Sequence, residues 1–149
     1  MSRLSKSFSM VLLSFAVSVL PSGCAVKLVS SYDETIDKAV TALQKKTEEH
    51  LVALESAEGL PECVYDKHKM FYNEFKVHVS GIAVRAEAIP DNRITNNMTK
   101  LLSQNIETLE KLHKISCLSK EQLIPLRSNF NSSFTAILKL ELAKRRGDE

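Results

Sequence analysis

Four long segments with helical periodicity, separated by short helix-breaking stretches, constrain the fold of this chain more than any other feature of its sequence. Within each segment, apolar residues recur at steps of three and four positions, which gathers them on one face of an α-helix. The segments cover residues 32–55, 62–88, 95–114 and 119–146. Helices of similar length joined by short connections favour an all-α fold, an antiparallel up-down-up-down four-helix bundle.

Side chains near the expected helix ends support this division. Ser30 or Ser31 can cap the first helix by accepting a hydrogen bond from a free backbone N–H group. Ser119 and Gln122 have the spacing of a capping box. Pro125 lies beyond the first turn of the fourth helix, so we expect a kink or a restart there. The run KRR at 144–146 suits a helix C-terminus, with contact to anionic lipid as the alternative.

The chain begins with a segment typical of exported proteins rather than of a packed domain. Arg3 and Lys6 precede 13 uncharged residues, from Phe8 to Leu20, and small residues follow. A basic start, an apolar stretch of about 7–15 residues and small residues are the marks of a secretory signal peptide. The apolar stretch is shorter than the roughly 20 residues that a transmembrane helix needs. We therefore expect residues 1–23 to be a signal peptide.

The sequence PSGC at residues 21–24 resembles the lipobox of bacterial lipoproteins. In that family a peptidase cleaves just before the cysteine, so the resemblance implies that Cys24 carries acyl chains and anchors the protein to a membrane. Ser22 and Gly23 match the small residues of the lipobox, whereas Pro21 stands where the family favours leucine. Cleavage after Ala25 by the ordinary signal peptidase is the alternative.

The same resemblance implies a location. The family retains lipoproteins at the inner membrane when Asp follows the cysteine, and here Ala25 follows it. We therefore expect the protein at the bacterial outer membrane, on its periplasmic face. Residues 24–31 are expected to form the lipidated cysteine and a short tether, and residues 32–149 the four-helix domain.

The charge balance excludes one class of function. The chain has 20 basic and 18 acidic residues. Since Arg3 and Lys6 belong to the expected signal peptide, the mature chain has 18 of each and no formal net charge. Nucleic-acid binding needs a basic surface that displaces counterions from phosphates. We therefore expect no nucleic-acid partner.

Three cysteines are present, namely Cys24, Cys63 and Cys117. With Cys24 lipidated or cleaved away, the other two remain in an oxidising compartment, where disulfides form. In the expected bundle Cys63 starts the second helix and Cys117 follows the third. An antiparallel helical hairpin brings these two ends together, so we predict a Cys63–Cys117 disulfide.

The sequence offers little for catalysis or cofactor binding. Glu110 and His113 have the Glu-x-x-His spacing of di-iron bundles, but that chemistry needs a second such motif and two further glutamates. The sequence has no second Glu-x-x-His. His68 and Met70 are ligands for soft metals, at a spacing that does not place them on one helix face. We therefore expect no catalytic residue, no metal site and no cofactor, and we do not expect an enzyme.

Apolar residues outside the core stripes indicate a protein partner. Met70, Val77 and Val84 are spaced by seven and offset from the core stripe of the second helix, and Leu140 lies outside the main face of the fourth. A helix that is apolar on more than one side is either centrally buried or covers a partner. The N-terminal tether or a loop is the alternative cover. We predict that these four residues bind an envelope protein.

These expectations describe a membrane-anchored periplasmic lipoprotein that acts as a helical binding or adaptor module. At the level of the fold it resembles the small helical pilotin lipoproteins, which escort secretion-channel subunits to the outer membrane, and the resemblance implies a protein partner. Two alternatives stay open. One is a small-ligand or metal carrier that uses the bundle interior around His78, Glu110 and His113, with His78 on the apolar side of its helix. The other is a periplasmic chaperone for unfolded clients.

Overall fold

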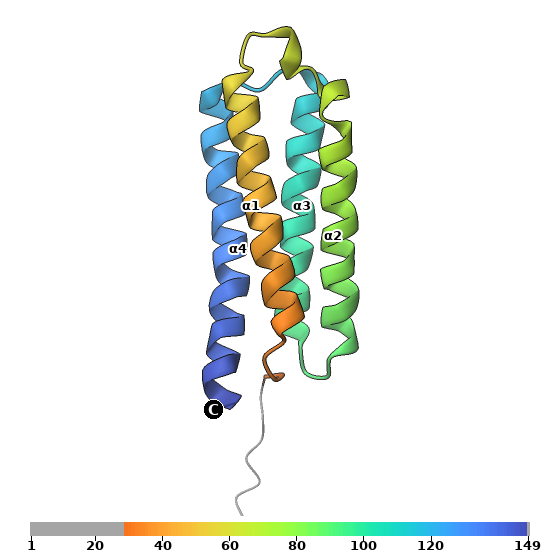
Figure 1. Cartoon of the computed structure of the whole chain (residues 1–149), viewed down its shortest axis with the longest axis vertical. Coiled ribbons are helices and arrows are strands. Elements are labelled where there is room, and N and C mark those ends of the chain that lie inside the picture. The colour runs from red at the N-terminus through yellow and green to blue at the C-terminus, as the bar shows by residue number, and fades with distance from the viewer. Residues whose placement is uncertain (1–28, 149) are drawn as a thin grey trace, which may run out of the picture.

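The computed structural model describes residues 29–148, and the expected signal peptide and Cys24 lie outside this range. The described residues form four long helices, with two short 3₁₀ turns, η1 and η2, between the first and the second. The elements are α1 (Glu34–Ser56), η1 (Pro61–Cys63), η2 (Tyr65–Lys67), α2 (Lys69–Ala88), α3 (Arg93–Ile115) and α4 (Lys120–Asp148). The predicted antiparallel four-helix bundle is confirmed (Figure 1).

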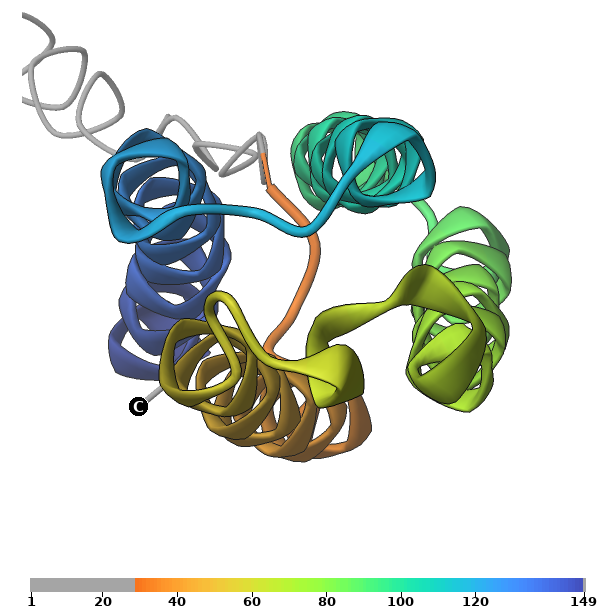
Figure 2. The same ribbon diagram turned by 90° about the horizontal axis from the view of Figure 1, so that it is seen from above.

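The helices form a ring in chain order. Each helix packs on the next one along the chain, and α4 closes the ring by packing on α1. Seen from above, the four helices stand at the corners of a square, so that α2 lies diagonally opposite α4 (Figure 2). Among the described residues, no helix has both the length and the apolar character needed to cross a membrane.

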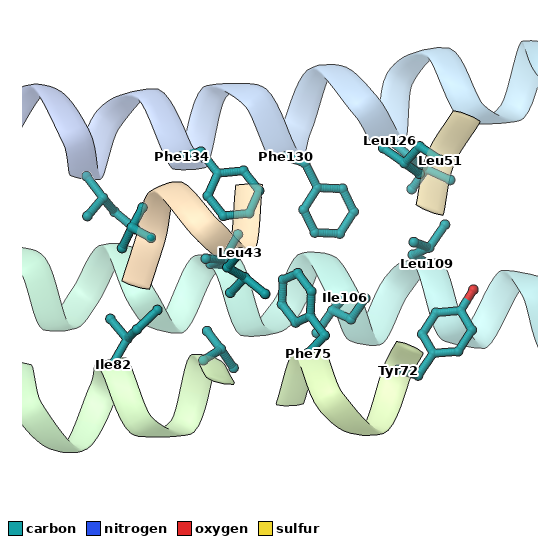
Figure 3. Close-up of a cluster of buried hydrophobic side chains, with 14 of the residues drawn as sticks. Leu43, Leu51, Tyr72, Phe75, Ile82, Ile106, Leu109, Leu126, Phe130 and Phe134 are labelled. Carbon is teal, nitrogen blue, oxygen red and sulfur yellow. The ribbon is translucent and has the colours of Figure 1, made fainter. Parts of the chain in front are cut away.

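The core follows the predicted three- and four-residue spacing. Aromatic rings from two diagonal helices meet in its middle, where Phe75 of α2 packs edge-on against Phe130 of α4 at 5.8 Å between ring centroids. Aliphatic side chains from all four helices fill the space above and below them (Figure 3). Burial of a side chain of this size contributes roughly 1.5–3 kcal/mol, so this stripe is the main source of stability.

Some core assignments from the sequence are wrong. Leu101 and Leu142, which fit the three- and four-residue spacing of their segments and are therefore expected in the core, are 55% and 48% exposed. Tyr72, which we did not select, is fully buried. In each case the buried stripe passes through a neighbouring residue. Whether a side chain points into the bundle depends on its angle around the helix axis, not on its hydrophobicity.

The helix ends also differ from the sequence-based assignment. The cap of α1 is Asp33, not Ser30 or Ser31, and its carboxylate accepts from the backbone N–H of Ile36 at 2.8 Å. The second helix begins at Lys69 instead of near residue 62, since the two 3₁₀ turns occupy the intervening chain. The capping box is confirmed, with reciprocal hydrogen bonds between Ser119 and Gln122.

Pro125 neither ends nor restarts α4, which is continuous from Lys120 to Asp148. Proline in this position removes only the backbone hydrogen bond to the carbonyl of Glu121 in the first turn. That carbonyl belongs to an exposed residue at the end of the bundle, where water can replace the lost donor. The expected restart is therefore wrong.

The chain before α1 is docked on the bundle. Residues 29–33 cross the end of the bundle that also holds the C-terminus and the turn between α2 and α3 (Figures 1 and 2). The Ser30 hydroxyl donates to Asn92 Oδ1 at 2.9 Å, and both nitrogens of Arg85 that face Asp33 donate to its carboxylate at 2.8 Å. The described part of the expected tether is therefore part of the folded domain. We call this the terminal end of the bundle, and the opposite end the disulfide end.

Candidate functional site

The outer face of α2 is the candidate docking surface. Met70, Val77 and Val84 are 73%, 71% and 69% exposed, the largest exposures among the big apolar residues of this helix. They point away from the bundle, because the inward positions of α2 are taken by a separate stripe. That buried stripe consists of Tyr72, Phe75, Val79, Ile82 and Ala86.

Leu140 does not belong to this surface. It is partly buried, and it lies on α4, at the corner diagonally opposite α2 (Figure 2). The structure therefore brings together three of the four predicted partner-binding residues. We restrict the candidate docking surface to the outer face of α2.

Three exposed apolar residues on α3 were missed by the sequence analysis. Ile94 and Leu101 are seven residues apart and 44% and 55% exposed, and Ile115 at the end of the helix is 80% exposed. The heptad step between Ile94 and Leu101 was the available signal. This step was overlooked because Leu101 also fits the core spacing, three residues after Met98.

Gly81 lies in the middle of the outer face of α2. A Cβ atom placed on it meets no heavy atom within 4 Å, so nothing in the bundle requires glycine there. Glycine inside a helix costs about 0.8–1 kcal/mol relative to alanine. We expect Gly81→Ala to raise the free energy of unfolding by about this amount, measured by urea denaturation. Gly147→Ala, near the end of α4, is the matched control and is expected to change stability much less; a loss of stability in Gly81→Ala would contradict the prediction.

The disulfide end contains a buried polar network. Cys63 and Cys117 are joined by a disulfide with 5.4 Å between their Cα atoms, the pairing that the helix topology predicts. Beside it, His113 is 1% exposed. Its Nε2 donates to the Cys63 carbonyl at 2.6 Å, and its Nδ1 accepts from the Tyr72 hydroxyl at 2.6 Å. Both ring nitrogens of the neutral imidazole are therefore satisfied.

Glu110 is buried, at 6% exposure. Its carboxylate accepts hydrogen bonds from Tyr65 at 2.7 Å, from Lys76 at 2.5 Å and from Lys114 at 3.0 Å. Burial by itself raises the pKa of a carboxyl group, but these three donors outweigh it and lower the pKa of Glu110 to about 2. Glu110 is thus a permanently charged acceptor that ties α3 to α2 and to η2.

His78 was also misplaced by the sequence analysis. It is exposed and takes no part in the network around Glu110 and His113, so the three residues of the carrier alternative do not form one site. The histidine whose ring lies beside that of His113 is His68, at 5.3 Å between centroids, and His50 of α1 lies on the other side of His68. The ring of His50 lies 5.2 Å from that of His68 and stacks on Phe71 at 3.6 Å between centroids.

His50 makes the stability of the bundle sensitive to acid. It is 7% exposed, and its Nε2 has no hydrogen-bond partner among the described residues. Burial, followed by the neighbouring His68 and His113, lowers the pKa of His50 to about 3. His50 is therefore protonated in the unfolded chain at a pH where it stays neutral in the folded chain. The free energy of unfolding falls as the pH drops below about 6.5.

This gives a prediction with a matched control. Between pH 7 and pH 5, protonation of His50 in the unfolded state lowers the free energy of unfolding by about 2 kcal/mol. Urea denaturation at the two pH values should show that His50→Leu removes this part of the loss. His78→Leu, at an exposed position, should retain the wild-type loss. An unchanged pH dependence in His50→Leu would contradict the assignment.

The terminal end holds a buried ion pair that the sequence analysis did not select. The side chains of Glu141 and Lys144 are 0% and 1% exposed and pair at 2.6 Å. Lys144 also donates to Thr95 and to Asn92. The run KRR does lie at the C-terminal end of α4, with Arg145 and Arg146 in the last turn, but Lys144 is buried and is not available for contact with lipid. The stripe of inward positions on α4 passes through 137, 141 and 144, and this spacing was the available signal.

Within residues 29–148, no three His, Cys, Asp or Glu side chains are grouped so that they can hold a metal ion. Comparisons of the chain with protein-family models, with curated proteins and with solved structures found no match.

Proposed function

We propose that this protein is a membrane-anchored periplasmic lipoprotein that binds another envelope protein through the outer face of α2. The single observation that carries the proposal is the exposed stripe of Met70, Val77 and Val84. Its seven-residue spacing matches two turns of a helix, so the partner element that fits it is an amphipathic helix. A stripe of this kind has no role in the packing of the bundle itself.

The position of the proposed anchor fits this role. Cys24 is five residues before Val29, and this stretch spans at most about 18 Å. Residues 30 and 33 are held on the terminal end by Asn92 and Arg85. An anchor at Cys24 therefore keeps the terminal end close to the membrane and leaves the side of α2 open to proteins on the same membrane.

The carrier alternative has less support. The ring nitrogens of His113 are engaged by Tyr72 and the Cys63 carbonyl, and the carboxylate of Glu110 is engaged by three donors. These groups already have the partners that a ligand would have to replace. We therefore do not extend the proposal to a small-ligand or metal carrier.

The proposal is tested by crosslinked pull-down of the full-length tagged protein from intact bacterial cells. We expect a dominant envelope protein to be captured by the wild type and to be lost with Val77→Asp or Val84→Asp. Because both residues are exposed, the circular dichroism of these variants should keep the wild-type helix content. Val52→Asp, at an exposed position of α1, is the matched control and should retain capture.

Two results would contradict the proposal. Equal capture by Val77→Asp and the wild type would show that α2 is not the docking surface. Equal capture by Cys24→Ser and the wild type, with the same distribution between membrane and soluble fractions, would show that Cys24 is not an anchor.

A further inference from the structure

We infer that the outer face of α2 binds α2 of a second copy of this chain, in a parallel two-stranded coiled-coil contact. The inference rests on the proposed docking role of α2 and names the occupant. In heptad notation, Met70, Val77 and Val84 take the a positions, and all three are exposed. Valine at a, together with leucine at d, favours two-stranded parallel coiled coils, and α2 has the a half of this pattern. The intervening d positions are Asn73 and Ser80, which are exposed and can hydrogen-bond to their counterparts.

The proposed anchor fixes the direction of the pairing. Both copies would leave the membrane from their terminal ends, so their α2 helices run in the same direction. In an antiparallel pair, one terminal end would lie a full helix length from the membrane. That distance is about 30 Å for the 20 residues of α2, beyond the reach of the stretch between Cys24 and Val29.

The charged residues beside the stripe fit a parallel pair. In parallel coiled coils, a g residue of one helix faces the e residue five positions later on the other. On α2 this relation joins Lys69 with Glu74 of the second copy, and the twofold symmetry repeats the pair. Within one chain, Lys69 pairs with Asp66 and lies 5.7 Å from the centre of the Tyr65 ring, and Glu74 pairs with Lys46. Asp66 and Lys46 are about half-exposed or more, so these ion pairs exchange at little cost.

The other flanking positions allow the helices to approach. The e positions after Glu74 are Gly81 and Ala88, both exposed. The space beside Gly81 is open, so a neighbouring helix can lie against it. The g residue opposite Gly81 is Lys76, which is held within its own chain by Glu110 at 2.5 Å. The pairing therefore brings no like charges together at the e and g positions. Glu87, at the last d position, accepts a hydrogen bond from Asn96 of its own chain.

Attachment to a membrane allows a small contact between two α2 helices to form. Three a residues per helix form a small seam, which is weak between molecules in dilute solution. Attachment to one surface raises the effective concentration of each copy for the other without any new contact. We therefore expect pairing of the anchored protein on membranes.

The first experiment is cysteine crosslinking of the full-length protein in intact cells. Cys63 and Cys117 are bridged and Cys24 is the proposed lipidation site, so Val77→Cys adds one free thiol. In a parallel pair this thiol faces its own counterpart. We expect a disulfide-linked dimer on non-reducing gels with Val77→Cys and with Val84→Cys. Val52→Cys on α1 is the matched control. If Val77→Cys and Val84→Cys give no more dimer than Val52→Cys, the inference is wrong.

The second experiment tests the direction and the charge pairing together. In the Val77→Cys background, Lys69→Glu or Glu74→Lys alone places like charges opposite each other and should lower the dimer yield several-fold. The double variant should restore the yield. Glu49→Lys, which changes an exposed charge on α1, should leave the yield unchanged. A double variant no better than either single variant would overturn the parallel pairing.

The two proposals fail in distinguishable ways. If the pull-down captures a different envelope protein through Val77, and Val77→Cys dimerises no more than Val52→Cys, the docking role of α2 holds and self-pairing is wrong. If self-crosslinking is strong and no other protein depends on Val77 for capture, the second copy is the partner at this face. If α2 shows neither contact, both proposals are wrong.

Discussion

Replacing both Cys63 and Cys117 by serine is expected to lower the free energy of unfolding by about 4 kcal/mol. The bridge spans 54 residues of sequence, and closing a loop of this length restricts the unfolded chain far more than the folded one. Serine is close to cysteine in size, so the native packing changes little. Urea denaturation of the double variant and the wild type without reductant measures the difference.

The controls separate the bridge from other effects of the substitution. Wild-type protein unfolded with a reductant should lose the same stability as the double variant. Cys24→Ser should lose none, since Cys24 takes no part in the bridge. Equal urea midpoints of the double variant and the wild type under oxidising conditions would show that the bridge does not form in the protein.

The sequence predicts the fold of this protein well for a clear physical reason. Helix periodicity is a local property, and four amphipathic segments with short connections have few ways to bury their apolar faces. The same topology also brings Cys63 and Cys117 to one end. Local details were less predictable. Asp33 caps α1 in place of Ser30 because Ser30 is engaged by Asn92, 62 residues away.

The polar interior could not be predicted by hydrophobicity. Glu110, His113, Glu141 and Lys144 all lie at inward positions, although charged and polar residues are usually exposed. Their burial depends on partners from other helices, such as Tyr72 for His113. A reading that followed helix angle alone would have found all four. The outer face of α2 was predictable because its spacing differs from that of the core stripe.

Breaking the buried ion pair at the terminal end should have an effect comparable to loss of the disulfide. In Glu141→Leu, Lys144 loses its counter-ion while its side chain stays in the interior. Removing one partner of a buried pair costs about 3–5 kcal/mol, because the remaining charge is uncompensated. Urea denaturation at neutral pH, compared with the exposed pair variant Glu49→Leu, measures this loss.

The double variant Glu141→Leu with Lys144→Met decides what the pair does. A buried pair is costly to desolvate, so apolar residues of similar size often replace both partners with little loss. Thr95 and Asn92 would lose the Lys144 donor, but Asn92 keeps its hydrogen bond from Ser30. We therefore expect the double variant to be more stable than either single variant. Because Glu141 and Lys144 are in contact at 2.6 Å, their effects on stability should not be additive. A double variant whose loss of stability equals the sum of the two single losses would contradict this prediction.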